Sequence, residues 1–318
     1  MSLSVVFMGT PQFAVPILQA LINDDQYDVK AVVTQPDRRV GRKHELRATP
    51  VKELAVKYGI EVLQPEKLSG STEMQRVIDL APDFEITAAF GQFLPVKMLE
   101  AAKIAAINVH GSLLPKYRGG APIQYSIING DQETGVTIMY MVKAMDAGDI
   151  IAQKAIPITK NDDSGTMFEK LSRLGRDLLM ETLPKLAKGD VQPVKQDPEK
   201  VVFSPNISSE QERIDYRLPA DRIDDKVRGL RPFPIGNMII DGIQTKIYDV
   251  TPLDEKTDLA PGQVVRVEKH ALILAAGNGT TYRINRLKPK GKREMDITSY
   301  LNGHQNLKQG VQAITDEE

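Results

Sequence analysis

The sequence lacks several features, and each absence excludes a class of protein. None of its 318 residues is cysteine, so it has no disulfide, no thiolate metal site and no cysteine nucleophile. No run of about 18 apolar residues occurs, and the N-terminus lacks the basic and apolar regions of a secretory signal. Charge of one sign is not in excess either, since 41 Lys and Arg accompany 42 Asp and Glu. We therefore expect a cytoplasmic protein with no membrane partner and no uniformly basic nucleic-acid coat.

The composition that remains is typical of a folded chain. Apolar residues make up 41% and charged residues 26%, close to the average of globular proteins. The length exceeds what one hydrophobic core usually organises, which favours two domains. Strand-like runs alternate with helical periodicity through the first half of the chain, and this alternation predicts an α/β fold with a doubly wound, mostly parallel sheet. These runs are residues 4–8, 27–34, 84–89 and 105–109.

The second half of the chain has a different pattern. A long helix is predicted at residues 164–188, because its leucines share one face. Residues 190–208 contain three prolines and little periodicity, which favours an extended linker. We therefore divide the chain into a first domain at residues 1–189, this linker and a second domain at residues 209–318. The second domain is predicted to be a small β-barrel or sandwich, with a helix and then short strands: residues 220–229 for the helix, and 238–240, 245–250, 263–267, 271–275 and 281–284 for the strands.

Two polar residues, Asn108 and His110, lie at the end of the strand predicted at residues 105–109. Ligands of open α/β sheets bind beyond the carboxyl ends of the strands, so this is a favourable place for a site. Residues two apart on a strand share a face, and an amide with an imidazole can stabilise an oxyanion or move a proton. The pair therefore suits acyl transfer. The residues alone leave an alternative open, in which Asn108 caps a turn and His110 is a hydrogen-bonded core residue.

The surrounding residues carry a longer pattern. The sequence N-V-H-G-S-L-L-P at residues 108–115, followed by Y-R-G and a proline, resembles the signature of the formyltransferases that use N10-formyltetrahydrofolate. Residues 7–14, 34–37 and 91–95 are similar to one branch of that family, which acts on methionyl-tRNA, and weaker likeness continues to residue 303. The resemblance implies a first domain that binds the formyl folate, followed by an OB-like barrel.

The resemblance also implies the roles of particular residues. Asn108, His110 and Asp146 fall where the family has its catalytic residues, and Asp146 opens a loop in which Ala147 replaces the family's usual threonine. That replacement affects a loop hydrogen bond rather than the acid. No metal is required, and the absence of G-x-G-x-x-G after the first strand disfavours a nicotinamide cofactor. The folate is expected to be bordered by two segments: Phe90, Gly91, Gln92, Phe93 and Leu94, and Ser112, Leu113, Leu114 and Pro115.

Two basic segments are candidates for contact with nucleic acid. Residues 38–52 contain six basic residues and one acid without strong periodicity, which predicts a flexible loop, either solvated or in contact with phosphates. The resemblance implies that this loop, with Arg38, Arg42 and Lys43, enters the acceptor end of initiator tRNA. Residues 283–293 contain six basic residues and no acid, and a basic barrel edge can hold a nucleic-acid backbone. Here the candidates for phosphate contact are Arg286, Lys288, Lys290 and Lys292, with Tyr282 and Tyr300 as nearby candidates for stacking.

These observations lead to one preferred function and two alternatives. We expect a monomeric enzyme that transfers a formyl group from N10-formyltetrahydrofolate to the α-amine of methionyl initiator tRNA. A formyltransferase acting on an amino sugar or on glycinamide ribonucleotide shares the core signature, but a small substrate needs neither the basic loop nor the second domain. A non-catalytic RNA-binding protein with a degenerate transferase domain is the third hypothesis. The intact trio of Asn108, His110 and Asp146 disfavours it.

Overall fold

The computed structural model describes residues 2–41 and 44–316. The chain divides into two compact units, each built from three segments. Unit 1 consists of Met1–Pro122, Glu133–Pro157 and Phe168–Pro205. Unit 2 consists of Ile123–Gln132, Ile158–Met167 and Asn206–Glu318. The division into residues 1–189, 190–208 and 209–318 stays a prediction.

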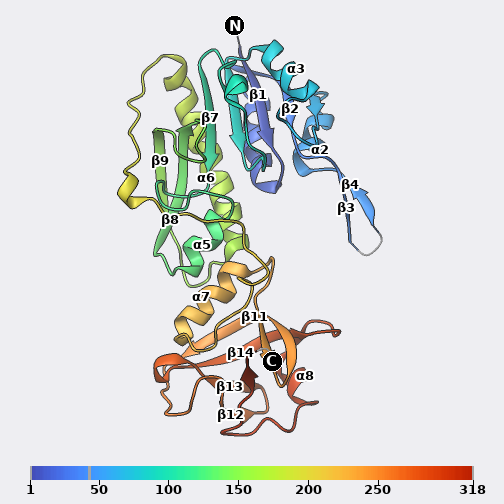
Figure 1. Ribbon diagram of the computed structural model, residues 1–318, viewed down its shortest axis with the longest axis vertical. Coiled ribbons are helices and arrows are strands. Elements are labelled where there is room, and N and C mark those ends of the chain that lie inside the picture. The colour runs from blue at the N-terminus through green and yellow to red at the C-terminus, as the bar shows by residue number, and fades with distance from the viewer. Residues whose placement is uncertain (1, 42–43, 317–318) are drawn as a thin grey trace. The chain divides into compact units, whose positions relative to one another are not determined.

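Unit 1 is built on a seven-stranded sheet of order β5-β2-β1-β6-β7-β8-β9 (Figure 1). The first five of these strands run parallel to one another, β8 runs antiparallel to β7, and β9 runs antiparallel to β8. The doubly wound, mostly parallel sheet predicted from the sequence is confirmed. The strands are β1 (Leu3–Gly9), β2 (Tyr27–Val33), β5 (Glu61–Leu63), β6 (Phe84–Ala88), β7 (Ala105–His110), β8 (Glu133–Tyr140) and β9 (Ile150–Pro157).

Helices cover both faces of this sheet. On one face, Val6 and Met8 of β1 pack in a core cluster with Val77 and Met98. On the other face, Gly175 lies so close to β7 that an added Cβ would be 2.8 Å from Val109 Cγ1. Ile107 and Val109 therefore face one way along β7, and Asn108 and His110 face the other. The helices of unit 1 are η1 (Gln12–Ala14), α1 (Val15–Ile22), α2 (Pro50–Lys57), α3 (Thr72–Leu80), α4 (Val96–Leu99), η2 (Pro198–Lys200) and, from Phe168 onward, α6 (Ser164–Ala187). From Ile123 onward, α5 (Pro122–Ile128) belongs to unit 2.

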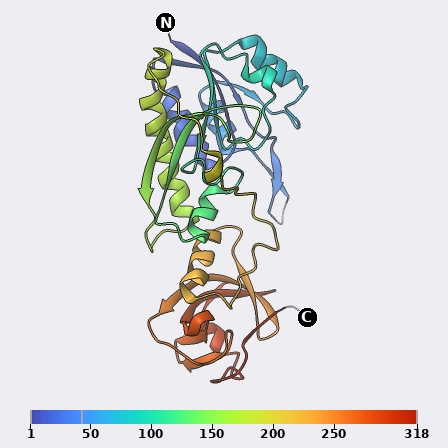
Figure 2. The same cartoon turned by 60° about the vertical axis from the view of Figure 1, so that its left-hand side comes forward.

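The basic segment after β2 differs from the flexible loop predicted. It forms an antiparallel hairpin of β3 (Arg38–Val40) and β4 (Glu45–Arg47), which stands away from the sheet in Figures 1 and 2. All three side chains of β4 are exposed. Strand periodicity comes from burial of one face, so a strand such as β4, with every side chain exposed, gives no periodic signal in the sequence. Arg42 and Lys43 lie outside the described residues.

Unit 2 contains an antiparallel sheet of order β12-β13-β14-β11-β10-β16, with β15 paired to β14. The sheet curls around a core cluster that includes Ile247, Leu272 and Tyr282, consistent with the predicted OB-like domain. The five predicted strands and the predicted helix lie on observed elements, although β11 and β14 are longer than predicted. The elements are α7 (Ala220–Leu230), β10 (Asn237–Ile240), β11 (Ile243–Leu253), β12 (Val264–Glu268), β13 (Ala271–Ala275), η3 (Gly277–Gly279), β14 (Thr281–Pro289), β15 (Met295–Asp296), α8 (Ile297–Leu301) and β16 (Ile314–Thr315).

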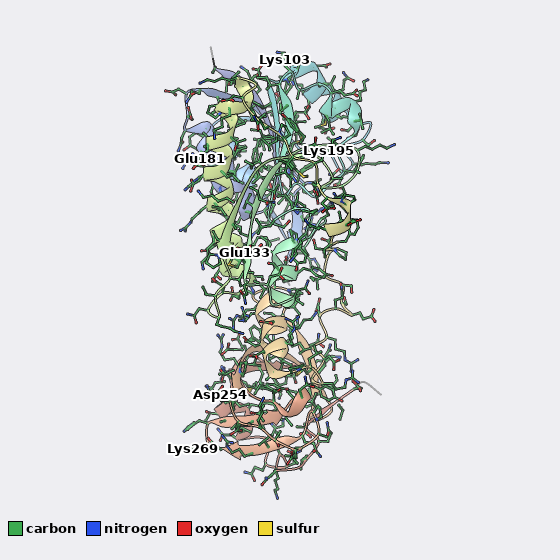
Figure 3. The ribbon with its side chains drawn as sticks, turned by 90° about the vertical axis from the view of Figure 1, so that its left-hand side faces the viewer. Lys103, Glu133, Glu181, Lys195, Asp254 and Lys269 are labelled. Carbon is green, nitrogen blue, oxygen red and sulfur yellow. The ribbon has the colours of Figure 1, made fainter. Side chains whose placement is uncertain are left out.

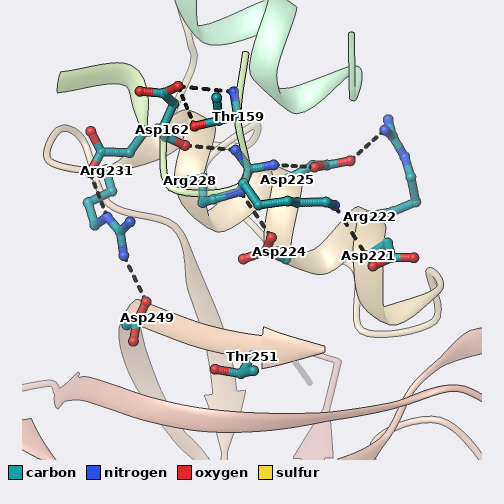
Figure 4. Close-up of polar contacts among 12 residues, drawn as sticks. Thr159, Asp162, Asp221, Arg222, Asp224, Asp225, Arg228, Arg231, Asp249 and Thr251 are labelled. Atoms are coloured by element: carbon teal, nitrogen blue, oxygen red, sulfur yellow. Dashed lines mark hydrogen bonds and ion pairs between the residues drawn. The ribbon is translucent and has the colours of Figure 1, made fainter. Parts of the chain in front are cut away.

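A group of paired charges holds α7 in unit 2 (Figure 4). The buried guanidinium of Arg228 donates to Asp224 at 2.9 Å, to Asp225 at 2.6 Å and to the Asp162 carbonyl at 2.7 Å. Arg231 donates to Asp163 at 2.8 Å and to a carboxylate on β11 at 2.9 Å. Buried charges require such partners, because an unpaired ion in the interior is strongly destabilising.

Candidate active site

Asn108 and His110 lie at the carboxyl end of β7, where the sequence predicts a site. Asn108 is half-buried and sits between Thr87 of β6 and Met139 of β8 in the sheet. His110 is buried and is aligned with Thr137 of β8. Both side chains belong to the face opposite Gly175 of α6, so they share one side of the sheet edge.

The imidazole of His110 has two different surroundings at its two nitrogens. Nε2 lies 2.9 Å from the Tyr117 carbonyl oxygen, and a carbonyl can only accept, so Nε2 carries a hydrogen and donates it. Nδ1 lies 3.8 Å from Oδ2 of Asp146, which is longer than a hydrogen bond. Nδ1 is therefore the nitrogen that can exchange a proton with a ligand or pair with the carboxylate.

Asp146 lies in the loop between β8 and β9. Its Oδ2 accepts a hydrogen bond of 2.8 Å from the Gly119 amide, and its backbone has a φ of 50°. Two residues later, Gly148 passes so close to the preceding strand that an added Cβ would lie 1.8 Å from the Tyr140 carbonyl oxygen. The loop is thus tightly turned, and it brings the carboxylate to the imidazole.

The segment 112–115 is anchored through its backbone. Thr137 Oγ1 donates to the Ser112 carbonyl at 2.7 Å and accepts from the Leu114 amide at 3.2 Å. Gln153 donates to the Leu114 carbonyl at 3.0 Å and to Thr137 at 2.8 Å. Ser112 and Leu114 are buried, so this loop offers a ligand a rigid edge rather than these two side chains.

The second predicted folate segment, Phe90 to Leu94, follows the neighbouring strand β6. Phe90 and Leu94 are part of the hydrophobic core of unit 1. The Gln92 side chain bonds within the protein, accepting from the Leu68 amide at 2.8 Å and donating to a proline carbonyl at 3.0 Å. Phe93, in contrast, is 61% exposed. Since parallel strands β6 and β7 end at the same edge, both predicted segments leave the sheet on the side where Asn108 and His110 lie.

Two residues that the sequence analysis did not assign to the site hold the Asp146 loop in place. The side-chain amide of Gln196 donates to the carbonyls of Asp146 and Gly148, both at 2.8 Å. Arg118 donates to the Gln196 oxygen at 3.0 and 2.8 Å. The Y-R-G signature pointed to Arg118, but Gln196 lies 78 positions further on in the predicted linker, and no sequence pattern connects the two.

The predicted tRNA-binding residues that the structure describes are divided between the two units. Arg38 on β3 is paired with Glu66 at 3.2 Å. In unit 2, Arg286 pairs with Glu294, and Lys288 lies beside Lys246 of β11. The exposed Lys290 and Lys292 follow in the turn after β14.

The prediction that Tyr282 and Tyr300 could stack on nucleic acid is wrong. Both are buried, with 0% and 2% of their surface exposed, because they point into the barrel core. Phe233, which the sequence analysis did not select, is 79% exposed just after α7. Its neighbour Pro234 accepts a hydrogen bond of 2.9 Å from Lys246, next to the basic strand β14.

Metal-binding clusters and membrane-spanning helices are both absent from the described part of the chain. Residues 2–41 and 44–316 contain no group of three or more His, Asp or Glu side chains placed to hold a metal ion. Within the same residues, no helix combines the length and apolar character needed to cross a membrane.

Comparison with known proteins identifies the class to which this fold and site belong. Residues 2–183 match the family model "Formyl transferase", and residues 206–305 match "Formyl transferase, C-terminal domain". The chain belongs to the formyl transferase family, which confirms the resemblance found in the sequence.

Individual members of the family show which of its proteins this chain is similar to. The chain is 76% identical to the methionyl-tRNA formyltransferase of Limosilactobacillus fermentum over 99% of both chains. It is 64% identical to the methionyl-tRNA formyltransferase of Lactiplantibacillus plantarum, over 94% of this chain and 95% of that protein. Among solved structures, the sugar 3N-formyl transferase WlaRD, determined with dTDP and 5-N-formyl-THF, superimposes with a TM-score of 0.66. It covers 92% of this chain and all of that one at 17% identity, which establishes a shared fold.

Proposed function

We propose that this chain transfers the formyl group of N10-formyltetrahydrofolate to the α-amino group of methionyl initiator tRNA. One observation carries the proposal: the imidazole of His110 and the carboxylate of Asp146 lie 3.8 Å apart at the end of β7, with Asn108 on the same face of that strand, in a chain that is 76% identical to a methionyl-tRNA formyltransferase. An amide, an imidazole and a carboxylate in this arrangement suit acyl transfer to an amine.

The reaction moves one formyl group and one proton. The lone pair of the neutral amine attacks the formyl carbon, and the electron pair of the C=O bond moves onto oxygen. When the oxyanion collapses, the bond from carbon to N10 of the folate breaks. The amine loses one proton and N10 gains one, so atoms and charge balance. The protein has to stabilise the oxyanion and provide a route for the proton.

Each residue of the trio has a part in this step. The Asn108 amide donates to the developing oxyanion, and protonated His110 donates to it through Nδ1, because Nε2 is already bound to the Tyr117 carbonyl. Asp146, 3.8 Å from Nδ1, pairs with the imidazolium and accepts the amine proton. One such oxyanion donor contributes on the order of 10²- to 10³-fold to the rate.

The folate is proposed to lie along the two segments that follow β6 and β7. Phe90 and Leu94 belong to the core, so the groups offered to a planar heterocycle are backbone amides and carbonyls together with the exposed Phe93. The Ser112 and Leu114 backbone is held by Thr137 and Gln153, which keeps one edge rigid. A preformed edge lowers the cost of ordering the site when the ligand binds.

The tRNA is proposed to contact basic residues in both units. In unit 1 these are Arg38 on the exposed hairpin and, beyond the described residues, Arg42 and Lys43. In unit 2 they are Arg286, Lys288, Lys290 and Lys292, with exposed Phe233 nearby as a surface for stacking. Phosphate contacts of this kind position RNA without reading its sequence.

The remaining parts of the proposal concern the protein's setting. We propose that it acts in the cytoplasm as a monomer, without a metal. Residues 1–189 form its catalytic domain and residues 209–318 its tRNA-binding domain, with 190–208 as the linker. The match of separate family models to residues 2–183 and 206–305 supports this division.

A single assay tests the proposed substrate. Purified protein with N10-formyltetrahydrofolate should formylate charged initiator tRNA much faster than charged elongator methionine tRNA or a nucleotide-linked amino sugar. Faster formylation of the amino sugar than of initiator tRNA would replace this function with the small-substrate alternative.

A further inference from the structure

The loop that carries Asp146 adopts a backbone conformation that needs outside support. Asp146 has a φ of 50°, in the left-handed region that residues other than glycine adopt uncommonly, although aspartate does so more often than most. Such a strained conformation persists only where the surroundings hold it. The geometry of this carboxylate therefore depends on what holds the loop.

The Gln196 side chain supplies that support with all of its hydrogen-bonding capacity. Its two N–H groups reach the Asp146 and Gly148 carbonyls, and its oxygen receives two N–H groups from Arg118. An amide has two donor hydrogens and one oxygen with two lone pairs, so every position is used. The guanidinium fixes which way the amide points, because an NH₂ group turned toward Arg118 would face another donor.

Arg118 is itself held by backbone hydrogen bonds, and its two neighbours in the chain contact His110 and Asp146. Its amide donates to the Val202 carbonyl at 2.9 Å, and its carbonyl accepts from the Ser204 amide at 2.7 Å. The Tyr117 carbonyl, just before it, accepts a hydrogen bond from His110, and the Gly119 amide, just after it, donates one to Asp146. Three consecutive residues, 117–119, thus hold the imidazole, the glutamine and the carboxylate.

We propose that Gln196 is a positioning residue for catalysis: seated on Arg118, it holds the Asp146 loop so that the carboxylate faces Nδ1 of His110. The inference rests on the proposed role of Asp146 in formyl transfer. Gln196 lies between exposed Lys195 (Figure 3) and Asp197, so catalytic geometry depends on a segment outside the parallel sheet.

Two substitutions distinguish the contact of Gln196 with Arg118 from its contacts with the Asp146 loop. Gln196→Leu removes both sets of hydrogen bonds and keeps a side chain of similar size. Gln196→Glu keeps an acceptor for Arg118 but loses the two hydrogen bonds donated to the loop. Gln192→Leu, at an exposed glutamine in the same segment, is the matched control. For each full-length protein, kcat, KM for both substrates, the pH profile of kcat and the melting temperature are measured.

We expect both Gln196 variants to lower kcat about 10- to 100-fold, because a displacement of about 1 Å can cost that much. KM for N10-formyltetrahydrofolate should stay within about twofold, and the acid limb of the kcat profile should move while the melting temperature does not. Arg118→Leu combined with Gln196→Leu should lose no more than the larger single loss, since the two residues act as a unit. Gln192→Leu should match the wild type.

The outcomes against the inference are distinct from failure of the proposed function. If Asp146→Asn loses at least 100-fold in kcat while both Gln196 variants keep the wild-type kcat and pH profile, Gln196 does not position the loop and the proposed chemistry stands. If Asp146→Asn itself keeps full activity, both proposals fail. Should Gln196→Leu not fold, Gln196→Glu decides alone.

Discussion

Glu85 places a carboxyl group inside unit 1 where neither of its oxygens has a hydrogen-bond partner among the described residues. It sits on β6 between Val6 of β1 and Ala106 of β7 and is fully buried. Burial disfavours the charged form and raises the pKa of Glu85 to about 8, against 4.5 as the ordinary value. At neutral pH this side chain is therefore mostly a neutral acid.

That raised pKa makes stability depend on pH. Between pH 4.5 and about 8 the folded chain keeps a proton that the unfolded chain has released. The free energy of unfolding therefore falls as the pH rises through this window, by on the order of 1.4 kcal/mol per unit. Glu85→Gln removes the titration, so its melting temperature should exceed that of the wild type by an amount that grows by roughly 5–10 °C from pH 5 to pH 8.

The control for this prediction is Glu181→Gln, on the exposed face of α6 (Figure 3). Its melting temperature should follow that of the wild type at every pH. Parallel curves for Glu85→Gln and the wild type would mean that Glu85 does not titrate in this range.

The proposed catalytic residues Asn108, His110 and Asp146 give the second prediction at the scale of single residues. Asn108→Ala, His110→Ala and Asp146→Asn should each lower kcat by about 10²-fold or more with little change in melting temperature. A double variant should lose far less than the product of the single losses, because the three act in one step. Initial rates with saturating folate and tRNA measure this. Near-wild-type rates in all three variants would show that these residues do not take part in the reaction.

At the scale of elements, α7 depends on charges that it buries. Arg228→Met leaves the carboxylates of Asp224 and Asp225 inside unit 2 without their guanidinium. Breaking a buried pair in this way costs about 3–5 kcal/mol, so the urea midpoint of unfolding should fall clearly. Arg266→Ala, which removes the exposed pairs with Glu255 and Glu268, should leave the midpoint nearly unchanged. Equal midpoints for both variants would contradict this account of α7.

The basic strand β14 gives a prediction about binding. Lys288→Ala with Lys290→Ala should reduce the slope of log tRNA affinity against log salt by about 0.7–0.9 for each phosphate that the protein no longer neutralises. Folate binding should not change, since it is proposed to use unit 1. Filter binding of initiator tRNA at several salt concentrations measures the slope. An unchanged slope would show that these lysines do not bind phosphate.

The elements differ in how well the sequence predicted them, and burial explains the difference. β1 and β6 are buried along most of their length, so their apolar runs mark them in the sequence. Half of the residues of β9 are exposed, and so are all three side chains of β4, so neither strand produces a hydrophobic pattern. Their hydrogen-bonded partners form them, and a single sequence does not reveal those partners.

For the whole molecule, the sequence predicted the position of Asn108 and His110 but not the residues that support Asp146. Asn108 and His110 were accessible to prediction because a strand end and a signature coincide there. The support of Asp146 was not, because it joins residues 50 and 78 positions apart through a segment interpreted only as a linker. Contacts at such separations depend on the finished fold, whereas capping and periodicity act locally.

The contacts that residues 194–204 make with Arg118 and Ile150 also limit how this enzyme can be joined to other domains. Val194 pairs with Ile150, and Phe203 with Arg118, so the chain is still joined to unit 1 well beyond the end of α6. A protein engineer who grafts the transferase onto a different recognition module should keep the natural chain through Pro205, where unit 1 ends. A chimera joined near residue 190 would retain Asn108, His110 and Asp146 but lack the glutamine that holds Asp146 in place.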